Sequence, residues 1–311
     1  MRSMLRWLGM GSIGLMICWI CFNGCKSYKQ QDDELPDTPN RGTIHISADE
    51  SFKPIIDAQV EVYESNHAGT HILVDYKPEA ECLKDMLVDS VRMIIATRYY
   101  TAAEKDLVSD SLKVALFNMV LARDAIAVIM NPESDIQYFT RDDIRKILQG
   151  KFTKNLIPVF DGVKATSTVR FIIDSVLHGD TLGPNVVAAR SSEEVIDYVS
   201  KTKDAVGFIG VSWIGNKDDI EQLGFLKKVK IIPLESIYNP EIFVTPLQAN
   251  IFNGNYPMVR DLVYILKERH KGLGHGFADF MSAEKGQLIF RRAYLMPAQR
   301  DFGIRQAILK E

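Results

Sequence analysis

Short apolar strands alternate with amphipathic helices along this chain, and this alternation limits the possible fold more than any other feature. In the first part of the chain, strands are predicted at residues 44–46, 72–76 and 92–96, and helices at residues 54–65 and 83–89. Alternating units of this length favour a mainly parallel, doubly wound α/β sheet. Ligands bind beyond the carboxyl ends of the strands in such sheets, where Ser51, Glu79 and Thr97 are expected to lie.

A second α/β unit is predicted between residues 125 and 226. Its strands are predicted at residues 125–130, 157–160 and 205–211, preceded by a separate strand at 113–122, and its helices at residues 141–148 and 191–200. From about residue 227 the chain is predicted to rejoin the first unit, with helices at residues 258–268 and 276–281. The length of 311 residues is sufficient for two domains of ordinary size.

Residues 161–177 form a predicted polar loop that runs directly into an amphipathic helix. Thr166, Ser167 and Thr168 offer hydroxyl groups where this helix is expected to begin. Free backbone N–H groups, the positive end of the helix dipole and several hydroxyls at one point can hold an oxyanion. An ordinary Ser/Thr N-cap would use the same residues, so this stretch alone leaves both interpretations open.

Residues 1–24 are predicted to be a lipoprotein signal peptide. Two arginines precede an apolar run that ends at Phe22 and is short for a membrane-spanning helix. The end of this run, residues 22–25, resembles a bacterial lipobox, in which the signal is cut before a cysteine that carries the lipid. We therefore expect lipidation at Cys25, a flexible tether at residues 25–42, and a lipid-anchored protein in the bacterial cell envelope that faces the periplasm.

Composition argues against several classes of function. The net charge of −3 provides no basic excess for nucleic-acid phosphates, so no nucleic-acid partner is expected. Cys18 and Cys21 would leave with the signal and Cys25 would be lipidated, so Cys82 alone remains and no intramolecular disulfide can form. The six histidines are scattered, and no metal-ligand spacing or nucleophile with a base is found. We expect a protein that is not an enzyme and that has no metal and no cofactor.

Several segments together resemble the phosphate-binding component of bacterial phosphate ABC transporters, a type II periplasmic binding protein. The segments are residues 124–132, 139–150, 206–210, 255–260 and 286–297, and the resemblance covers most of residues 43–297. It implies two α/β domains joined by crossing strands, with the ligand in the cleft and a Venus-flytrap closure. Domain one would comprise residues 43–124 and 227–311, and domain two residues 125–226.

The resemblance also implies the positions of the ligand-binding loops. Ser51 matches the hydroxyl residue of the first loop, and Thr97 with Arg98 matches a segment in which a polar residue followed by arginine reaches the anion. Residues 165–167 match the Ser-Gly-Thr of the family. The expected ligand-binding residues are Glu50, Ser51, Thr97, Arg98, Ala165, Thr166, Ser167 and Thr168. Arg170 is expected on a helix face that points away from the ligand.

This chain departs from the family pattern mainly through acidic residues. Ala165 lacks the first hydroxyl, Thr166 replaces the glycine, and Asp161 stands where many members have arginine. The acidic residues near the loops are Asp49, Glu50, Glu79, Glu81 and Asp161. One carboxylate can accept a hydrogen bond from a protonated oxyanion, but five are too many. Either several of them face solvent or the ligand is not phosphate.

These observations predict a monomeric, membrane-anchored protein that captures inorganic phosphate or a similar oxyanion for an ABC permease. Two alternatives stay open at this point. One is an envelope interaction protein that has kept the fold and lost tight anion binding, with the acidic loops contacting a protein partner. The other is a receptor for a different solute, either another oxyanion or a cation.

Overall fold

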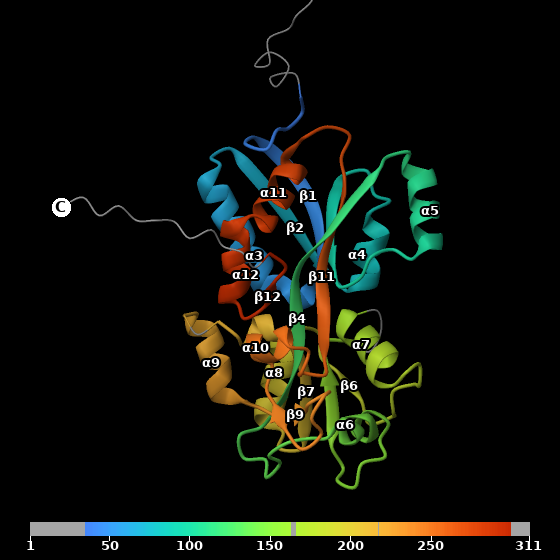
Figure 1. The fold of residues 1–311 in the computed structure, drawn as a ribbon, viewed down its shortest axis with the longest axis vertical. Coiled ribbons are helices and arrows are strands. Elements are labelled where there is room, and N and C mark those ends of the chain that lie inside the picture. Colours follow the sequence, from blue (N-terminus) through green and yellow to red (C-terminus); the bar gives the residue numbers. More distant parts are fainter. Residues whose placement is uncertain (1–34, 163–165, 217, 300–311) are drawn as a thin grey trace, which may run out of the picture.

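Two lobes share one ten-stranded sheet in the computed structural model, which describes residues 35–162, 166–216 and 218–299. The strand order is β2-β1-β3-β11-β4-β7-β5-β6, with β8 and β12 each paired to β4. The first lobe is built on β1, β2 and β3, and the second on β5, β6 and β7. Figure 1 shows the two lobes one above the other, with β4 and β11 running through both.

The first lobe contains three parallel strands covered by helices. The strands are β1 (Gly42–Asp49), β2 (Thr70–Lys77) and β3 (Val91–Ala96). The helices are η1 (Glu50–Phe52), α3 (Lys53–Asn66), α4 (Glu79–Asp85), α5 (Ala102–Leu112), α11 (Leu273–Ser282) and α12 (Glu284–Arg292). Ile44 and Ile46 of β1 pack with Phe52, Tyr63 and Phe277 in a buried core. Burial of these large side chains is the main force that holds the helices to the sheet.

The second lobe repeats this arrangement with three further parallel strands. They are β5 (Ile157–Phe160), β6 (Val187–Ala188) and β7 (Ala205–Gly210). The other elements are α6 (Arg141–Leu148), α7 (Ser167–Phe171), the π-helical turn η2 (Ile172–Val176), α8 (Ser192–Lys201), η3 (Val211–Trp213), α9 (Ile220–Lys228), β8 (Lys230–Ile231), β9 (Leu234–Glu235), β10 (Phe243–Val244) and α10 (Gln248–Phe252). The stacked rings of Phe160 and Phe208, 4.8 Å apart, lie in the core of this lobe.

Two long antiparallel strands join the lobes. β4 (Leu116–Met130) pairs with β11 (Val259–Lys267) along its first part and with β7 and β8 along its second part. The short strand β12 (Met296–Pro297) also pairs with β4. The predicted architecture of two α/β lobes joined by crossing strands is thus confirmed.

Three local predictions are wrong. The segment predicted to be a helix at residues 258–268 instead forms strand β11. The apolar run of this strand is buried between β3 and β4, so it lacks the alternation of a half-exposed strand that would have distinguished it from a helix. β4 is one strand where two were predicted, since the buried Asp124 interrupts the apolar pattern without breaking the strand. Glu79 begins α4, in a segment predicted to be a loop.

The chain after residue 227 contributes to both lobes. Leu234, Ile251 and Tyr256 pack with Phe160 and Phe208 in the core of the second lobe, whereas domain one was expected to include this segment. These contacts favour a second domain that extends to about Met258, and the division into domains stays a proposal.

Among the described residues, no helix is long and apolar enough to cross a membrane. The predicted signal peptide, the lipidation site Cys25 and most of the tether lie outside the described residues.

Candidate functional site

Buried polar side chains gather where the two lobes meet. They are Asp49, Ser51, Glu79, Thr97, Asp124, Asp161, Thr166, Ser167, Thr168, Ser192, Ser212 and Arg260. Burial of polar groups away from water is unfavourable unless they are paired, so a concentration of them marks a candidate functional site. The residues come from the carboxyl ends of β1, β3 and β5, from η1 and η3, from the starts of α4, α7 and α8, and from the crossing strands.

Ser51 of the first lobe makes hydrogen bonds with residues of the second lobe. Its hydroxyl donates to Asp161 Oδ2 (3.1 Å) and lies 3.5 Å from the Ser167 hydroxyl. Its carbonyl accepts hydrogen bonds from Ser212 Oγ (3.2 Å) and Trp213 Nε1 (2.9 Å). The backbone N–H of Ser51 donates to Asp49 Oδ1 (3.0 Å), which fixes the turn η1. The hydroxyl is therefore held at the junction, beyond the carboxyl end of β1, where Ser51 was expected to lie.

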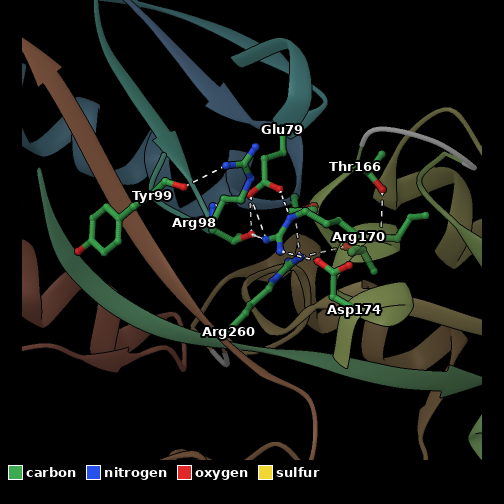
Figure 2. A network of polar contacts seen from close by, with 12 residues as sticks. Glu79, Arg98, Tyr99, Thr166, Arg170, Asp174 and Arg260 are labelled. Carbon is green, nitrogen blue, oxygen red and sulfur yellow. Dashed lines mark hydrogen bonds and ion pairs between the residues drawn. The ribbon is translucent and has the colours of Figure 1, made fainter. Parts of the chain in front are cut away.

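Glu79, Thr97 and Arg170 form a second connection between the lobes (Figure 2). The Thr97 backbone N–H and hydroxyl both donate to Glu79 Oε1, at 2.8 and 2.6 Å. Arg170 of α7 donates from Nε to Glu79 Oε2 (2.5 Å) and from Nη2 to Thr97 Oγ1 (2.7 Å). The expectation that Arg170 points away is wrong, because the first turn of α7 faces the carboxyl end of β3.

A buried ion pair lies where the strands cross. Arg260 of β11 is opposite Asp124 of β4, and its Nε donates to Asp124 Oδ2 (2.9 Å). Its Nη1 donates to the hydroxyls of Ser167 (2.8 Å) and Thr168 (3.2 Å). Its Nη2 is buried and has no hydrogen-bond partner among the described residues. This guanidinium therefore presents a free donor at the junction.

Arg260 was not among the residues predicted for the site. Asp124 begins one of the segments that carry the family resemblance, and Arg260 ends another. Only the register of β4 against β11 brings the two residues together. The sequence signal that could have indicated this pair is a single charged residue within or beside an apolar strand segment, since such a residue needs a partner when it is buried.

The carboxyl groups at the junction differ in their affinity for protons. Burial raises the pKa of Asp49 to about 7, although the charge of Arg260 opposes this shift. Burial is the main cause that raises the pKa of Glu50 to about 7, and the negative charge of Asp161 is the second. Burial also raises the pKa of Asp161. Burial acts in the same direction on Glu79, but hydrogen bonds from Arg170 and Thr97 outweigh it and hold the pKa of Glu79 below its ordinary value.

Six of the eight predicted ligand-binding residues lie together at the junction. They are Glu50, Ser51, Thr97, Thr166, Ser167 and Thr168. Glu50 accepts hydrogen bonds from the Ser192 backbone N–H (3.3 Å) and hydroxyl (3.4 Å) across the junction. Their role in ligand binding stays a prediction.

Thr166 also has a structural role in its helix, and the two remaining predicted residues, Arg98 and Ala165, are not part of this group. Thr166 is the N-cap of α7, and its hydroxyl accepts from the Val169 backbone N–H (3.3 Å). Arg98 forms a bidentate ion pair with Glu104, with N–O distances of 2.7 and 2.9 Å, so its guanidinium is engaged within the first lobe. Ala165 lies outside the described residues. Within the described part of the chain, no group of three His, Cys, Asp or Glu residues could hold a metal ion.

Two curated relatives are similar to most of this chain. The phosphate-binding protein PstS of Borreliella burgdorferi is 21% identical over 264 residues, which cover 80% of this chain and 87% of that protein. The phosphate-binding protein PstS of Bacillus subtilis is 22% identical over 284 residues, which cover 87% of this chain and 85% of that protein.

Solved structures share the fold. A Clostridium perfringens substrate-binding protein, assigned to phosphate ABC transport and solved with bound phosphate, matches with a TM-score of 0.69 at 20% identity. The match covers 83% of this chain and 100% of that chain, and it shows that this fold is that of the type II periplasmic binding proteins. The model of the PBP superfamily domain matches residues 35–285, which is most of the chain. The protein therefore belongs to the PBP superfamily.

Proposed function

We propose that this protein captures inorganic phosphate, or a similar oxyanion, in a cleft between its lobes and delivers it to an ABC permease. Its task is binding and not catalysis. The two curated relatives are named as phosphate-binding proteins, and the Clostridium perfringens structure contains phosphate. Two lobes joined by a pair of crossing strands suit reversible closure around a ligand.

The observation that carries this proposal is the meeting of hydroxyl and guanidinium donors from both lobes. The donors are Ser51 and Thr97 of the first lobe, Ser167 and Thr168 of the second lobe, and the guanidiniums of Arg170 and Arg260. Guanidinium groups bind oxyanions through charge-assisted, often paired hydrogen bonds. The unpartnered Nη2 of Arg260 is the donor that this arrangement leaves for a ligand.

The acidic residues are compatible with an oxyanion that carries a proton. A protonated carboxyl group can donate a hydrogen bond to an anion oxygen, and an ionised one can accept from a P–OH group. Glu50 and Asp49, with pKa values of about 7, supply both forms near neutral pH. Sulfate carries no proton near neutral pH, so an ionised carboxylate at the site would disfavour it.

Calorimetric titration with phosphate and with sulfate tests the proposed function. We would use the protein purified from membranes in detergent, after unfolding and refolding to remove bound ligand. Phosphate should bind and sulfate should not. Arg170→Ala should weaken phosphate binding at least about tenfold, because a hydrogen bond to a charged group contributes about 1.5–3 kcal/mol.

Arg98→Ala is the matched control, because Arg98 is engaged by Glu104 within the first lobe. Its phosphate affinity should stay close to that of the wild type. Absence of binding to both anions would refute the proposed ligand. A large loss in Arg98→Ala would instead restore Arg98 as a ligand-binding residue.

We also propose that a lipid on Cys25 anchors the protein to the bacterial cell envelope, where it faces the periplasm. The lipobox-like end of the apolar segment, residues 22–25, supports this proposal. Cys25→Ser should move the protein from the membrane fraction to the soluble fraction or leave its signal uncleaved. Membrane association with normal processing in this variant would refute lipid anchoring at Cys25.

A further inference from the structure

The Glu79 carboxylate is surrounded by hydrogen-bond donors of the kinds that bind oxyanions. A backbone N–H and a hydroxyl, both from Thr97, donate to one of its oxygens. The guanidinium of Arg170 donates to the other oxygen at 2.5 Å. Only 2% of the Glu79 side chain is exposed, so water does not satisfy this carboxylate. Backbone N–H, hydroxyl and guanidinium are the groups that bind phosphate oxygens in proteins.

The donors come from opposite sides of the junction. Thr97 follows β3 of the first lobe, whereas Arg170 belongs to α7 of the second lobe. Glu79 begins α4, which packs on β1 and β3, so its carboxylate reaches from the first lobe to the second. Figure 2 shows Glu79 and Arg170 pointing toward each other. One carboxylate therefore both fills the donors and ties the two lobes together.

We propose that Glu79 is a tethered internal anion, whose carboxylate occupies the Thr97 and Arg170 donors that a bound oxyanion would use. This proposal rests on the proposed function, since it concerns the same anion site. The ligand must displace Glu79 before it can contact these donors. Only the fraction of molecules in which Glu79 has left the Thr97 and Arg170 donors can bind the ligand. The measured affinity is lower than the intrinsic affinity by this factor.

The charge of Glu79 makes this competition effective near neutral pH. Its pKa lies below the ordinary value because Arg170 and Thr97 outweigh the effect of burial. The carboxylate therefore stays ionised while it is bound to the donors. An ionised carboxylate and a phosphate anion repel each other, so both cannot share one guanidinium at low cost.

A different role for Glu79 predicts the opposite result. If Glu79 accepted a hydrogen bond from a protonated oxyanion, removal of its charge would weaken phosphate binding. If Glu79 competes with the ligand, the same change tightens binding. The sign of the change in affinity separates the two roles.

The test compares Glu79→Gln with the wild type by phosphate titration of the full protein in detergent. Glutamine keeps the size of the side chain but loses its charge, and its amide group cannot accept hydrogen bonds from Arg170 with both of its polar atoms. Arg170 is 31% exposed and can be solvated in the variant, so the fold should be kept. Glu81→Gln is the matched control, because Glu81 lies on the same helix and is exposed.

We expect Glu79→Gln to bind phosphate about tenfold more tightly, if the tethered state is favoured by about ten to one. Glu81→Gln should bind like the wild type. Glu79→Ala, which removes the carboxylate altogether, should change the affinity in the same direction.

Two results would overturn the proposal, and they differ in what they say about the proposed function. Phosphate binding by the wild type that is unchanged or weaker in Glu79→Gln and Glu79→Ala would refute the tethered anion and leave the proposed function intact. No phosphate binding by any of the four proteins, with intact folds by circular dichroism, would refute both.

Discussion

Carboxyl groups at the junction avoid mutual repulsion in two different ways. Glu79 and Asp124 are each paired with an arginine, at 2.5 and 2.9 Å. Among the described residues, Asp49 and Glu50 form no ion pair with an arginine, and burial raises their pKa values to about 7. The site is therefore less negative than its number of acidic residues suggests, because Asp49 and Glu50 are each protonated in part near neutral pH.

Asp49 should make the stability of the protein depend on pH. The pKa of Asp49 is about 7 in the folded protein, whereas the ordinary value for an aspartate is 3.8. Between these values the folded state holds a proton that the unfolded chain releases, so the free energy of unfolding falls as pH rises. The loss of stability caused by ionisation of the buried Asp49 should be absent below about pH 4 and complete above about pH 7.

Asp49→Asn should remove this pH dependence, because asparagine is neutral and its oxygen can still accept from the Ser51 N–H. Urea unfolding at pH 5 and pH 8, without ligand, measures the difference between variant and wild type. The advantage of the variant should grow by at least about 1.4 kcal/mol over this range, the equivalent of one pKa unit. An advantage that is the same at both pH values would show that Asp49 is ionised throughout in the folded protein.

The residues of the site were partly predictable from sequence. Ser51, Thr97 and Ser167 follow predicted strands or begin a predicted helix, so their shared edge of the sheet could be inferred. The partners of the arginines could not, because they depend on contacts between segments far apart in the chain. Arg170 lies 91 positions from Glu79, and Arg260 lies 136 positions from Asp124.

At the scale of elements, prediction succeeded where one face of an element is exposed. α6 and α8 have clear polar and apolar faces and were predicted nearly at their observed bounds. β11 is buried from Leu262 to Lys267, and an apolar run without polar alternation does not distinguish a strand from a helix. The sheet that surrounds β11 decides its conformation, and that sheet forms only from distant parts of the chain.

Two threonine N-caps allow a comparison between a structural helix start and one at the candidate site. Thr140 caps α6 through the Asp143 N–H (3.0 Å), and Thr166 caps α7 through the Val169 N–H (3.3 Å). Thr140→Ala and Thr166→Ala should each lower the free energy of unfolding by about 1 kcal/mol, the usual value of such a cap. Only Thr166→Ala should also weaken phosphate binding, because α7 carries Ser167, Thr168 and Arg170.

Urea unfolding and phosphate titration of the two variants provide the measurements. Phosphate affinity equal to that of the wild type in both variants would mean that Thr166 is a helix cap with no effect on phosphate binding. Loss of affinity in Thr140→Ala would mean that the site responds to stability in general and not to α7 in particular.

At the scale of the whole molecule, two separate cores are connected by shared strands. Phe277 belongs to the core of the first lobe and Phe208 to that of the second, and both side chains are completely buried. β4 pairs with β11 in one part and with β7 in the other, so neither lobe can unfold without losing strand pairs that the other lobe also uses. We therefore expect the two lobes to unfold as one cooperative unit.

This connection predicts that a core mutation in either lobe lowers the stability of the whole protein. Phe277→Ala and Phe208→Ala should each reduce the free energy of unfolding by about 3–5 kcal/mol, because each leaves a cavity in a close-packed core. Scanning calorimetry should show one transition in the wild type and in both variants, shifted to lower temperature as a whole. Because the two sites lie in different cores, their effects should add in the double variant. A second transition in either variant, with the rest of the heat absorbed at the wild-type temperature, would show that the lobes unfold independently and that β4 and β11 only tether them.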